Sequence, residues 1–300
     1  MRPSGGPGVW RPARGIWFRI VAVLLLGLLV PALPVPAADA GESPAFISRI
    51  AAFRPRTVEC RVTVTLYEGG GFTLEMYLWA VLPALWRLDV TGVSPPGPQS
   101  QIVGVRMVFQ EDRVRLYDPT TGRVLEQRVS AELGTRPGAS GRMGFTLAEL
   151  LFVDDPTNYD LVAAVPQTVE GRPLVRYDFV LRRPELVDRV LIARESIWVD
   201  PRSSEPLRAQ LYDPAGRPVG IVVLKDHRRV PSGVGLPMTV EMFMETGSAR
   251  TTARVAFQLK DGRFYLPQRI DAYQGTRPMM SIVYAGCLVN RPIDPARFQL

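Results

Sequence analysis

The sequence predicts a mainly β, antiparallel protein with helical insertions, and three observations support this fold class. Most of the chain alternates apolar and polar residues with a period of two, which is typical of strands that bury one face. Short turns rich in Asp, Pro and Gly separate these runs, and turns this short connect antiparallel neighbours. Between residues 130 and 170 the alternation stops and helical spacing replaces it.

The first half of the sheet is expected after residue 53. In "GFTLEMYLWA" (71–80) the apolar residues at even positions share one face. "LWRLDV" (85–90), "IVGVRMVFQ" (102–110) and "DRVRLY" (112–117) continue the pattern. The residues expected on the inner face are Phe72, Leu74, Met76, Leu78, Trp86, Leu88, Val90, Val103, Val105, Met107, Phe109, Val114 and Leu116.

Strands resume at "PLVRYDFVL" (173–181) and continue to the end of the chain, giving about eleven or twelve strands in total. The two turns "YDPTTG" and "YDPAG" begin with Asp-Pro and place Gly122 and Gly216 where a positive φ is needed. The inner face of this half is expected to hold Val175, Tyr177, Phe179, Leu181, Met238, Val240, Met242 and Met244.

Helical spacing occurs in two places. "SPAFISRIAAF" (43–53) has an apolar stripe and Ser43 as an N-cap candidate. "FTLAELLFV" (145–153) combines capping-box spacing of Thr146 and Glu149 with an apolar stripe, and a second short helix is expected from about Asp160. The helical insertion therefore covers residues near 142–165, and its apolar stripe consists of Leu147, Leu150 and Leu151.

The first forty residues have the pattern of an export signal. A basic region precedes the apolar run "IVAVLLLGLLV" (20–30), and Ala38-Asp39-Ala40 matches an A-x-A cleavage site before Gly41. The run is short for a membrane span, although an uncleaved anchor is the alternative interpretation. We therefore expect residues 1–40 to be a signal peptide and residues 41–300 to form a single β domain.

Charge and cysteine content restrict the class of protein further. The formal net charge is +7, but the basic residues are scattered singly along strands, which argues against nucleic-acid binding. The two cysteines, Cys60 and Cys287, stand at opposite ends of the expected domain. In an exported protein they could form a disulfide between the first and last strands, or they could be two buried free thiols. The sequence favours neither.

The inner face carries more Met, Phe, Leu and Trp than a small barrel buries by itself. One interpretation is a filled core with a helix across it; the other is a curved sheet that encloses an apolar cavity under the 142–165 lid. The cavity interpretation makes these residues the candidate ligand-binding set: Leu74, Met76, Leu78, Trp86, Leu88, Met107, Phe109, Leu116, Phe179, Val240, Met242 and Met244.

Four stretches resemble the LolA/LolB-like lipoprotein-carrier superfamily. "VLPALWRLDV" (81–90) is similar to a Pro–aromatic–Arg strand of that superfamily, and "VFQEDRVRLYDPTTGRV" (108–124) is similar to its hairpin with a Tyr-Asp-Pro turn. "SIWVDPRSSEPLRAQLYDPAGRPV" (196–219) resembles its most recognisable strand pair. "NRPIDPARFQL" (290–300) resembles its closing segment.

The resemblance implies an unclosed antiparallel half-barrel with an N-terminal helix and lid helices over the concave face. It implies that acyl chains of a lipid or an acylated lipoprotein bind on that face, without catalysis and without a cofactor. We also expect a monomer that is exported to the periplasm or to the extracytoplasmic face of the cell envelope, with an envelope protein as donor or acceptor. One position departs from the pattern, because the lipoprotein chaperone has an Arg just before the strand's Pro and this chain has Leu82 before Pro83.

Candidate catalytic and metal-binding residues are sparse. His227, the one histidine, sits in the charged segment "LKDHRRVPSG", and no nucleophile elbow is present. One His and two distant Cys do not make a zinc site. Asp154, Asp155 and Asp160 could hold calcium weakly, but helix capping and turn formation account for them more simply. "EGGGF" (68–72) lacks the Lys-Ser/Thr of a phosphate loop.

Two functional hypotheses follow. The first is a non-catalytic carrier, which predicts a removable acyl ligand and a cavity lined by Met and aromatic residues with no ionisable groups. The second is an envelope sensor or protein-interaction module, which predicts a filled core and an exposed apolar patch.

Overall fold

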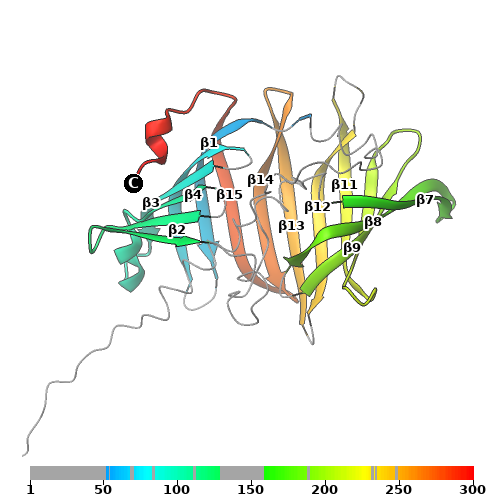
Figure 1. Ribbon diagram of the computed structural model, residues 1–300, viewed down its shortest axis with the longest axis horizontal. Helices are drawn as coiled ribbons and strands as arrows, with labels where there is room; N and C mark the ends of the chain where they lie inside the picture. Colours follow the sequence, from blue (N-terminus) through cyan, green and yellow to red (C-terminus); the bar gives the residue numbers. More distant parts are fainter. Residues whose placement is uncertain are drawn as a thin grey trace, which may run out of the picture.

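A computed structural model shows one curved antiparallel sheet of 15 strands. It describes residues 52–53, 55–67, 71–82, 85–110, 113–128, 159–187, 190–230, 233, 235–246 and 249–300. The strands run in the order β6-β5-β4-β3-β2-β1-β15-β14-β13-β12-β11-β10-β9-β8-β7. Figure 1 shows β13, β14 and β15 in the middle of the long axis, with β2–β4 on one side and β7–β9 on the other.

The first six strands form one half of the sheet, which we call the N-terminal wing. Their bounds are β1 Thr57–Leu66, β2 Phe72–Val81, β3 Leu85–Ser94, β4 Arg106–Gln110, β5 Arg113–Asp118 and β6 Arg123–Arg128. A 3-10 helix, η1 Pro98–Ile102, lies between β3 and β4. Consecutive strands are neighbours throughout, as expected for hairpins with short turns.

The remaining strands form the C-terminal wing. Their bounds are β7 Tyr159–Val169, β8 Arg172–Val187, β9 Val190–Val199, β10 Pro206–Tyr212, β11 Pro218–Arg229, β12 Gly235–Thr246, β13 Ala249–Lys260, β14 Phe264–Gln274 and β15 Arg277–Val289. A second 3-10 helix, η3 Pro295–Phe298, follows β15.

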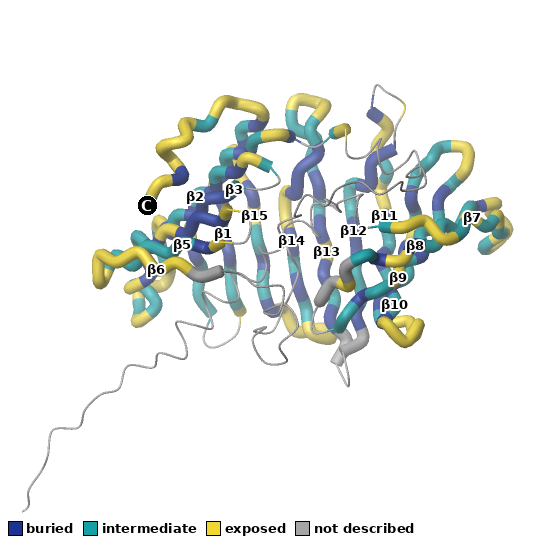
Figure 2. The backbone as a smooth tube through the Cα atoms, in the orientation of Figure 1, coloured by how far each residue is buried: buried dark blue, intermediate teal, exposed yellow. Residues whose placement is uncertain are grey.

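The two wings join through the pairing of β1 with β15, the first and last strands. The two edge strands are therefore β6 and β7, which are consecutive along the chain and lie at opposite ends of the sheet (Figure 2). The sheet is open at both of these edges. The expectation of a mainly β, unclosed antiparallel sheet is confirmed.

The expected strand count and the second insertion helix are wrong. The sheet has 15 strands and not about eleven, and the segment from Asp160 is strand β7. The segment "DDPTNYDLVAAV" suggested a helix, but from Ala163 onward the burial of β7 alternates, because Ala163, Val165, Gln167 and Val169 are half-buried and the residues between them are exposed. Pairing with β8 along the whole strand outweighs the local preference.

The other helical predictions lie wholly or mostly outside the described residues. The helix at 145–153, with Leu147, Leu150 and Leu151, and residues 1–40 lie outside the described residues. Of the helix expected at 43–53, only Ala52 and Phe53 are described, and they form a turn. The described ranges contain the two 3-10 helices and no α-helix. Within those ranges no helix has the length and apolar character that crossing a bilayer requires.

Most of the buried apolar side chains lie on one side of the sheet, which we call the apolar face. Directly paired residues of neighbouring strands point to the same side, so the register defines this face across both wings. One continuous row contains Val240, Val255, Ile270, Ile282, Val64 and Leu74, from β12 through β15 and β1 to β2. We call it the central row, and its members belong to or pack against one hydrophobic cluster that spans both wings.

The opposite side, which we call the outer face, is partly covered in the N-terminal wing by residues 291–300. Arg87 of β3 donates from Nη1 to the backbone carbonyls of Arg297 and Gln299, and Arg115 of β5 donates to that of Phe298 at 3.0 Å. Phe298 is buried. The C-terminal segment lies at the end of the sheet that holds β2–β4 (Figure 1).

Candidate functional site

The clearest candidate site is an apolar row that crosses the N-terminal wing to its edge. It contains Leu78, Leu88, Met107, Leu116 and Leu125, one from each of β2 to β6, and each residue is paired directly with the next. We call it the β2–β6 row. Cys60 of β1 pairs with Leu78 at its inner end.

Exposure increases along the β2–β6 row toward the edge. Leu78 and Leu88 are each 3% exposed, Met107 is 0% exposed and Leu116 is half-buried, while Leu125 on β6 is 57% exposed. A strand at the edge of a sheet has a neighbour on one side only, so its side chains lose half of their cross-strand cover. The apolar face therefore continues without a break from the buried core to a solvent-exposed edge.

The other edge of the apolar face is also exposed. Leu161 of β7 pairs with Phe179 of β8, and it is 37% exposed while Phe179 is 2% exposed. Val162, at the bulge between Leu161 and Ala163, is 66% exposed. Both ends of the sheet thus present large apolar side chains to solvent.

The structure brings most of the predicted ligand-binding residues together. All of the twelve candidates except Phe179 lie in or against the main cluster, where nine are buried and Leu116 and Met242 are half-buried. Phe179 belongs to a separate small cluster with Val199, and Tyr159 meets its ring edge-on at 5.8 Å. The candidate set is therefore one contiguous surface with one outlier.

Sequence reasoning missed several members of the same face. Val62 and Val64 of β1, Val255 of β13 and Ile270 of β14 are all buried in the main cluster. The period-two pattern in "VECRVTVTL" was a signal for the β1 residues. Val103, in contrast, was expected on the inner face and lies in the turn after η1, 40% exposed.

A small pocket of about 20 Å³ opens on the apolar face where the two wings meet. Its walls include the two disulfide-bonded cysteines, Cys60 and Cys287, together with Ala80, Leu82, Trp86 and Tyr284. Such a volume holds little more than one water molecule. The central part of the apolar face is therefore filled in this structure rather than hollow.

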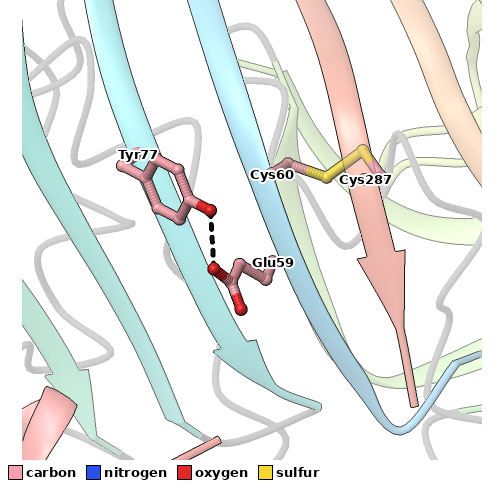
Figure 3. Close-up of a disulfide and its surroundings, with 4 residues drawn as sticks. All are labelled: Glu59, Cys60, Tyr77 and Cys287. Carbon is pink, nitrogen blue, oxygen red and sulfur yellow. Dashed lines mark hydrogen bonds between the residues drawn. A yellow bond between two sulfur atoms is a disulfide. The ribbon is translucent and has the colours of Figure 1, made fainter. Parts of the chain in front are cut away.

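Cys60 and Cys287 form a disulfide that joins the wings. The sulfur atoms are 2.04 Å apart, and the cysteines stand on the paired strands β1 and β15 (Figure 3). The register of this pair shifts between Glu59 and Arg61, opposite Gly286, whose φ of +62° suits a glycine at a bulge. The two cysteines are 227 residues apart in the sequence, and both are buried on the apolar face.

The outer face directly behind this site is polar and specifically paired. Arg87 forms a two-pronged ion pair with Asp89, with nitrogen–oxygen distances of 2.6 and 2.7 Å, and its guanidinium lies over the Trp79 ring. The guanidinium of Arg297 approaches the same ring. Tyr77 donates to Glu59 at 2.6 Å (Figure 3), and this hydrogen bond is the main reason that the pKa of Tyr77 is raised.

A second outer-face cluster lies in the C-terminal wing. Glu241 of β12 is buried and accepts hydrogen bonds from Lys225 at 2.6 Å and from Arg254 at 2.6 Å. These two cations, Lys225 first, hold the pKa of Glu241 below its usual value. Its role is to pair three strands, β11 to β13.

A metal-binding cluster is not found in the part of the chain that the structure describes. No group of three or more His, Cys, Asp or Glu there could hold a metal ion. His227 lies in strand β11 and not in a turn, half-buried, where its Nε2 donates to the Pro206 carbonyl at 2.8 Å. Asp160 pairs with Arg182 at 2.7 Å. Asp154 and Asp155 lie outside the described residues.

Comparison with known proteins gives similarity in structure but not in sequence. No protein-family model matches the chain, and no curated protein matches it. A DUF1329 family protein from Desulfovibrio piger is similar in structure, with 12% identity, a TM-score of 0.48 and coverage of 85% of this chain and 94% of the other.

Two further solved structures are similar to the chain. A putative outer membrane lipoprotein-sorting protein domain from Vibrio parahaemolyticus has 9% identity and a TM-score of 0.46, covering 84% of this chain and 94% of its own. A LolA superfamily protein from Nitrosomonas europaea has 10% identity and a TM-score of 0.46, covering 87% and 99%. All three similarities are in structure alone, at identities of 9–12%.

Proposed function

We propose that this chain is a non-catalytic exported binding protein that holds acyl chains of a lipid or lipoprotein on its apolar face and carries them in the cell envelope. The observation that supports this most is the β2–β6 row, which runs from a fully buried centre to Leu125, 57% exposed at the edge. An apolar surface that is continuous with solvent gives a flexible hydrocarbon chain a place to enter.

The side chains of the apolar face suit a ligand of variable shape. Met107 lies in the middle of the β2–β6 row, and Met242 and Met244 lie on the same face in β12. The unbranched thioether of methionine adapts to irregular contacts more easily than branched side chains do. Acyl chains that differ in length or unsaturation could therefore be accommodated by repacking of these residues.

The proposal includes the predicted processing of the chain. Residues 1–40 act as the export signal, and residues 41–300 form the mature carrier. The donor and acceptor of the cargo are envelope proteins or membranes.

Uptake of lipid from vesicles tests this function. The mature chain from Gly41 is incubated with phosphatidylglycerol vesicles that contain a radiolabelled lipid, and label in the protein fraction is counted after gel filtration. Wild-type protein should retain label. Leu125→Arg should reduce retention roughly tenfold, since losing one buried leucine contact costs about 1.5–3 kcal/mol.

Val283→Arg is the matched control. Val283 is 36% exposed and lies on the outer face of β15, between the apolar-face residues Ile282 and Tyr284. An arginine there adds the same charge without touching the proposed site, so uptake should be unchanged. No retention by wild-type protein contradicts the proposed function.

A second function has its own supporting observation. The pocket on the apolar face measures only about 20 Å³, while Leu125, Leu161 and Val162 are exposed at the edges. A filled core with exposed apolar edges is also what an envelope sensor or protein-interaction module would present to a partner. Absence of lipid uptake together with a folded protein would favour this function.

A further inference from the structure

The pocket where the two wings meet lies beside the inner end of the β2–β6 row. Leu78, the first residue of the row, is one of its wall residues, and so are Ala80 and Trp86. Cys60, which pairs with Leu78, and its disulfide partner Cys287 form the opposite wall. The pocket and the row are therefore one continuous apolar surface.

The chemistry of the pocket excludes the polar end of a lipid. Apart from the hydroxyl of Tyr284 and the indole nitrogen of Trp86, its wall side chains carry only carbon and sulfur. Burial raises the pKa of Tyr284, so this hydroxyl stays protonated and uncharged. Placing a phosphate or carboxylate here without a partner would be strongly unfavourable, and a site with so few polar partners also holds water poorly.

The span of the row fits a single acyl chain. From Trp86 on β3 to the edge strand β6 there are three strand spacings, which at ~4.8 Å each amount to about 14 Å. One leaflet of a bilayer contributes about half of its ~30 Å hydrocarbon core, which is about 15 Å. A chain whose polar end lies at the exposed edge therefore reaches the pocket with its other end.

We propose that the pocket beside the Cys60–Cys287 disulfide receives the methyl end of a bound acyl chain, which lies across β3 to β6 with its polar end at the β6 edge. This proposal rests on the proposed function and adds an orientation and an end point to it. Met107 and Leu116, midway along the row, would repack against the chain.

Tryptophan fluorescence can read this orientation directly. The proposed mature chain contains Trp79, Trp86 and Trp198, and only Trp86 lies on the apolar face. Trp79 contacts Arg87 and Arg297 on the outer face, and Trp198 contacts Arg208 there. A Trp79→Phe/Trp198→Phe protein therefore has one indole, at the pocket.

The probes are two fatty acids of equal length, one brominated near its methyl end and one near its carboxyl end, because bromine quenches an indole that it touches. At equal occupancy, the fatty acid brominated near its methyl end should quench Trp86 at least threefold more strongly than the one brominated near its carboxyl end. The occupancy is measured by mass spectrometry of the complex. Equal quenching, or stronger quenching by the carboxyl-end bromide, would overturn the proposed orientation.

Filling the pocket provides a second test. Ala80 is 0% exposed in the pocket wall, and Ala80→Leu should weaken binding of the long fatty acid about tenfold while a shorter one binds as before. Ala253→Leu adds the same bulk on the apolar face of β13, outside the pocket, and should not change this length preference. If Ala80→Leu does not fold, Leu82→Phe at a half-buried wall position replaces it.

The outcomes separate this inference from the proposed function. Wild-type protein that binds neither brominated acid by mass spectrometry contradicts both. Binding of both acids without preferential quenching of Trp86, and without a change of length preference in the filled variant, contradicts the methyl-end site alone.

Discussion

The two faces of β2 and β3 differ more than any other neighbouring regions of this molecule. On the apolar face, Leu78 and Leu88 stand side by side and are each 3% exposed. One residue further along, on the outer face, Trp79 pairs with Arg87, whose guanidinium is fixed by Asp89 and by two backbone carbonyls. The same two strands therefore contribute to two surfaces with opposite chemistry.

The difference shows how one sheet can combine tolerance with specificity. Hydrophobic contacts are non-directional, so the apolar face can exchange one apolar neighbour for another at little cost. The Arg87 contacts depend on a planar fork with fixed geometry, so they select one partner, which here is the chain's own C-terminal segment. A ligand of variable shape is expected on the first face only.

The largest effect is expected from a charge placed at a buried position of the apolar face. Phe109 is 4% exposed, and Phe109→Asp would bury a carboxylate that has no partner. We expect a loss of more than about 5 kcal/mol, enough to prevent folding of a typical domain. Circular dichroism and urea titration measure it.

The neighbouring residue serves as the control for that substitution. Gln110 in the same strand is exposed, and Gln110→Asp should change stability by less than about 0.5 kcal/mol.

Met242→Asp, at a half-buried position of the apolar face, should leave a folded protein that no longer takes up lipid. A stably folded Phe109→Asp protein would mean that the apolar face around Phe109 is open to water.

The second effect concerns the bond that joins the wings. Replacing both Cys60 and Cys287 by Ala should lower the free energy of unfolding by about 2–5 kcal/mol, because the unfolded chain is no longer closed into a long loop. Urea denaturation of the variant and of the wild type, with and without reductant, measures it. Identical midpoints for all samples would contradict a stabilising disulfide.

The third effect sharpens the outer-face half of the comparison. Arg87→Ala removes the partner of Asp89 and of two carbonyls, and should cost about 2–3 kcal/mol. It should also speed hydrogen exchange of the amides of residues 297–299. Arg115→Ala, which removes one hydrogen bond to Phe298, is the matched control and should have a smaller effect on both. Unchanged exchange in Arg87→Ala would show that the segment is held by other contacts.

The smallest effect depends on pH. The folded-state pKa of Glu241 is lowered by Lys225 and Arg254, so its contribution is present above the unfolded value of about 4.3 and is lost as pH falls through the lower folded value. Glu241→Gln should therefore cost up to about 1 kcal/mol at pH 7, since both cations are largely exposed, and almost nothing near pH 3. A stability difference that grows on acidification would contradict this assignment.

Local features of the sequence were sufficient for the hairpins. Gly122 and Gly216 have φ values of +66° and +78°, as their turns require, and alternation identified the apolar face of β2 to β5. The pairing of β1 with β15 joins residues such as Val64 and Ile282, and no local pattern encodes a contact of that range. The helix expected at Asp160 failed for a related reason, since β8 determines the conformation of β7.

The solvent exposure of the site residues also could not be predicted from the sequence. Leu116 and Leu125 are directly paired on neighbouring strands, yet one is half-buried and the other is 57% exposed. Only the strand order shows that β6 is an edge. Which part of an apolar face a ligand can reach is a property of the whole sheet, and a period-two pattern does not contain it.

The central claim is that the apolar face holds an acyl ligand, and a native mass spectrum of the exported chain tests it most directly. The protein is purified from Gly41 onward without detergent, so that a ligand acquired in the cell is retained. We expect a discrete excess mass that organic extraction removes and that matches an acyl lipid. A spectrum at the bare polypeptide mass, together with no uptake when lipid is offered, would contradict the claim.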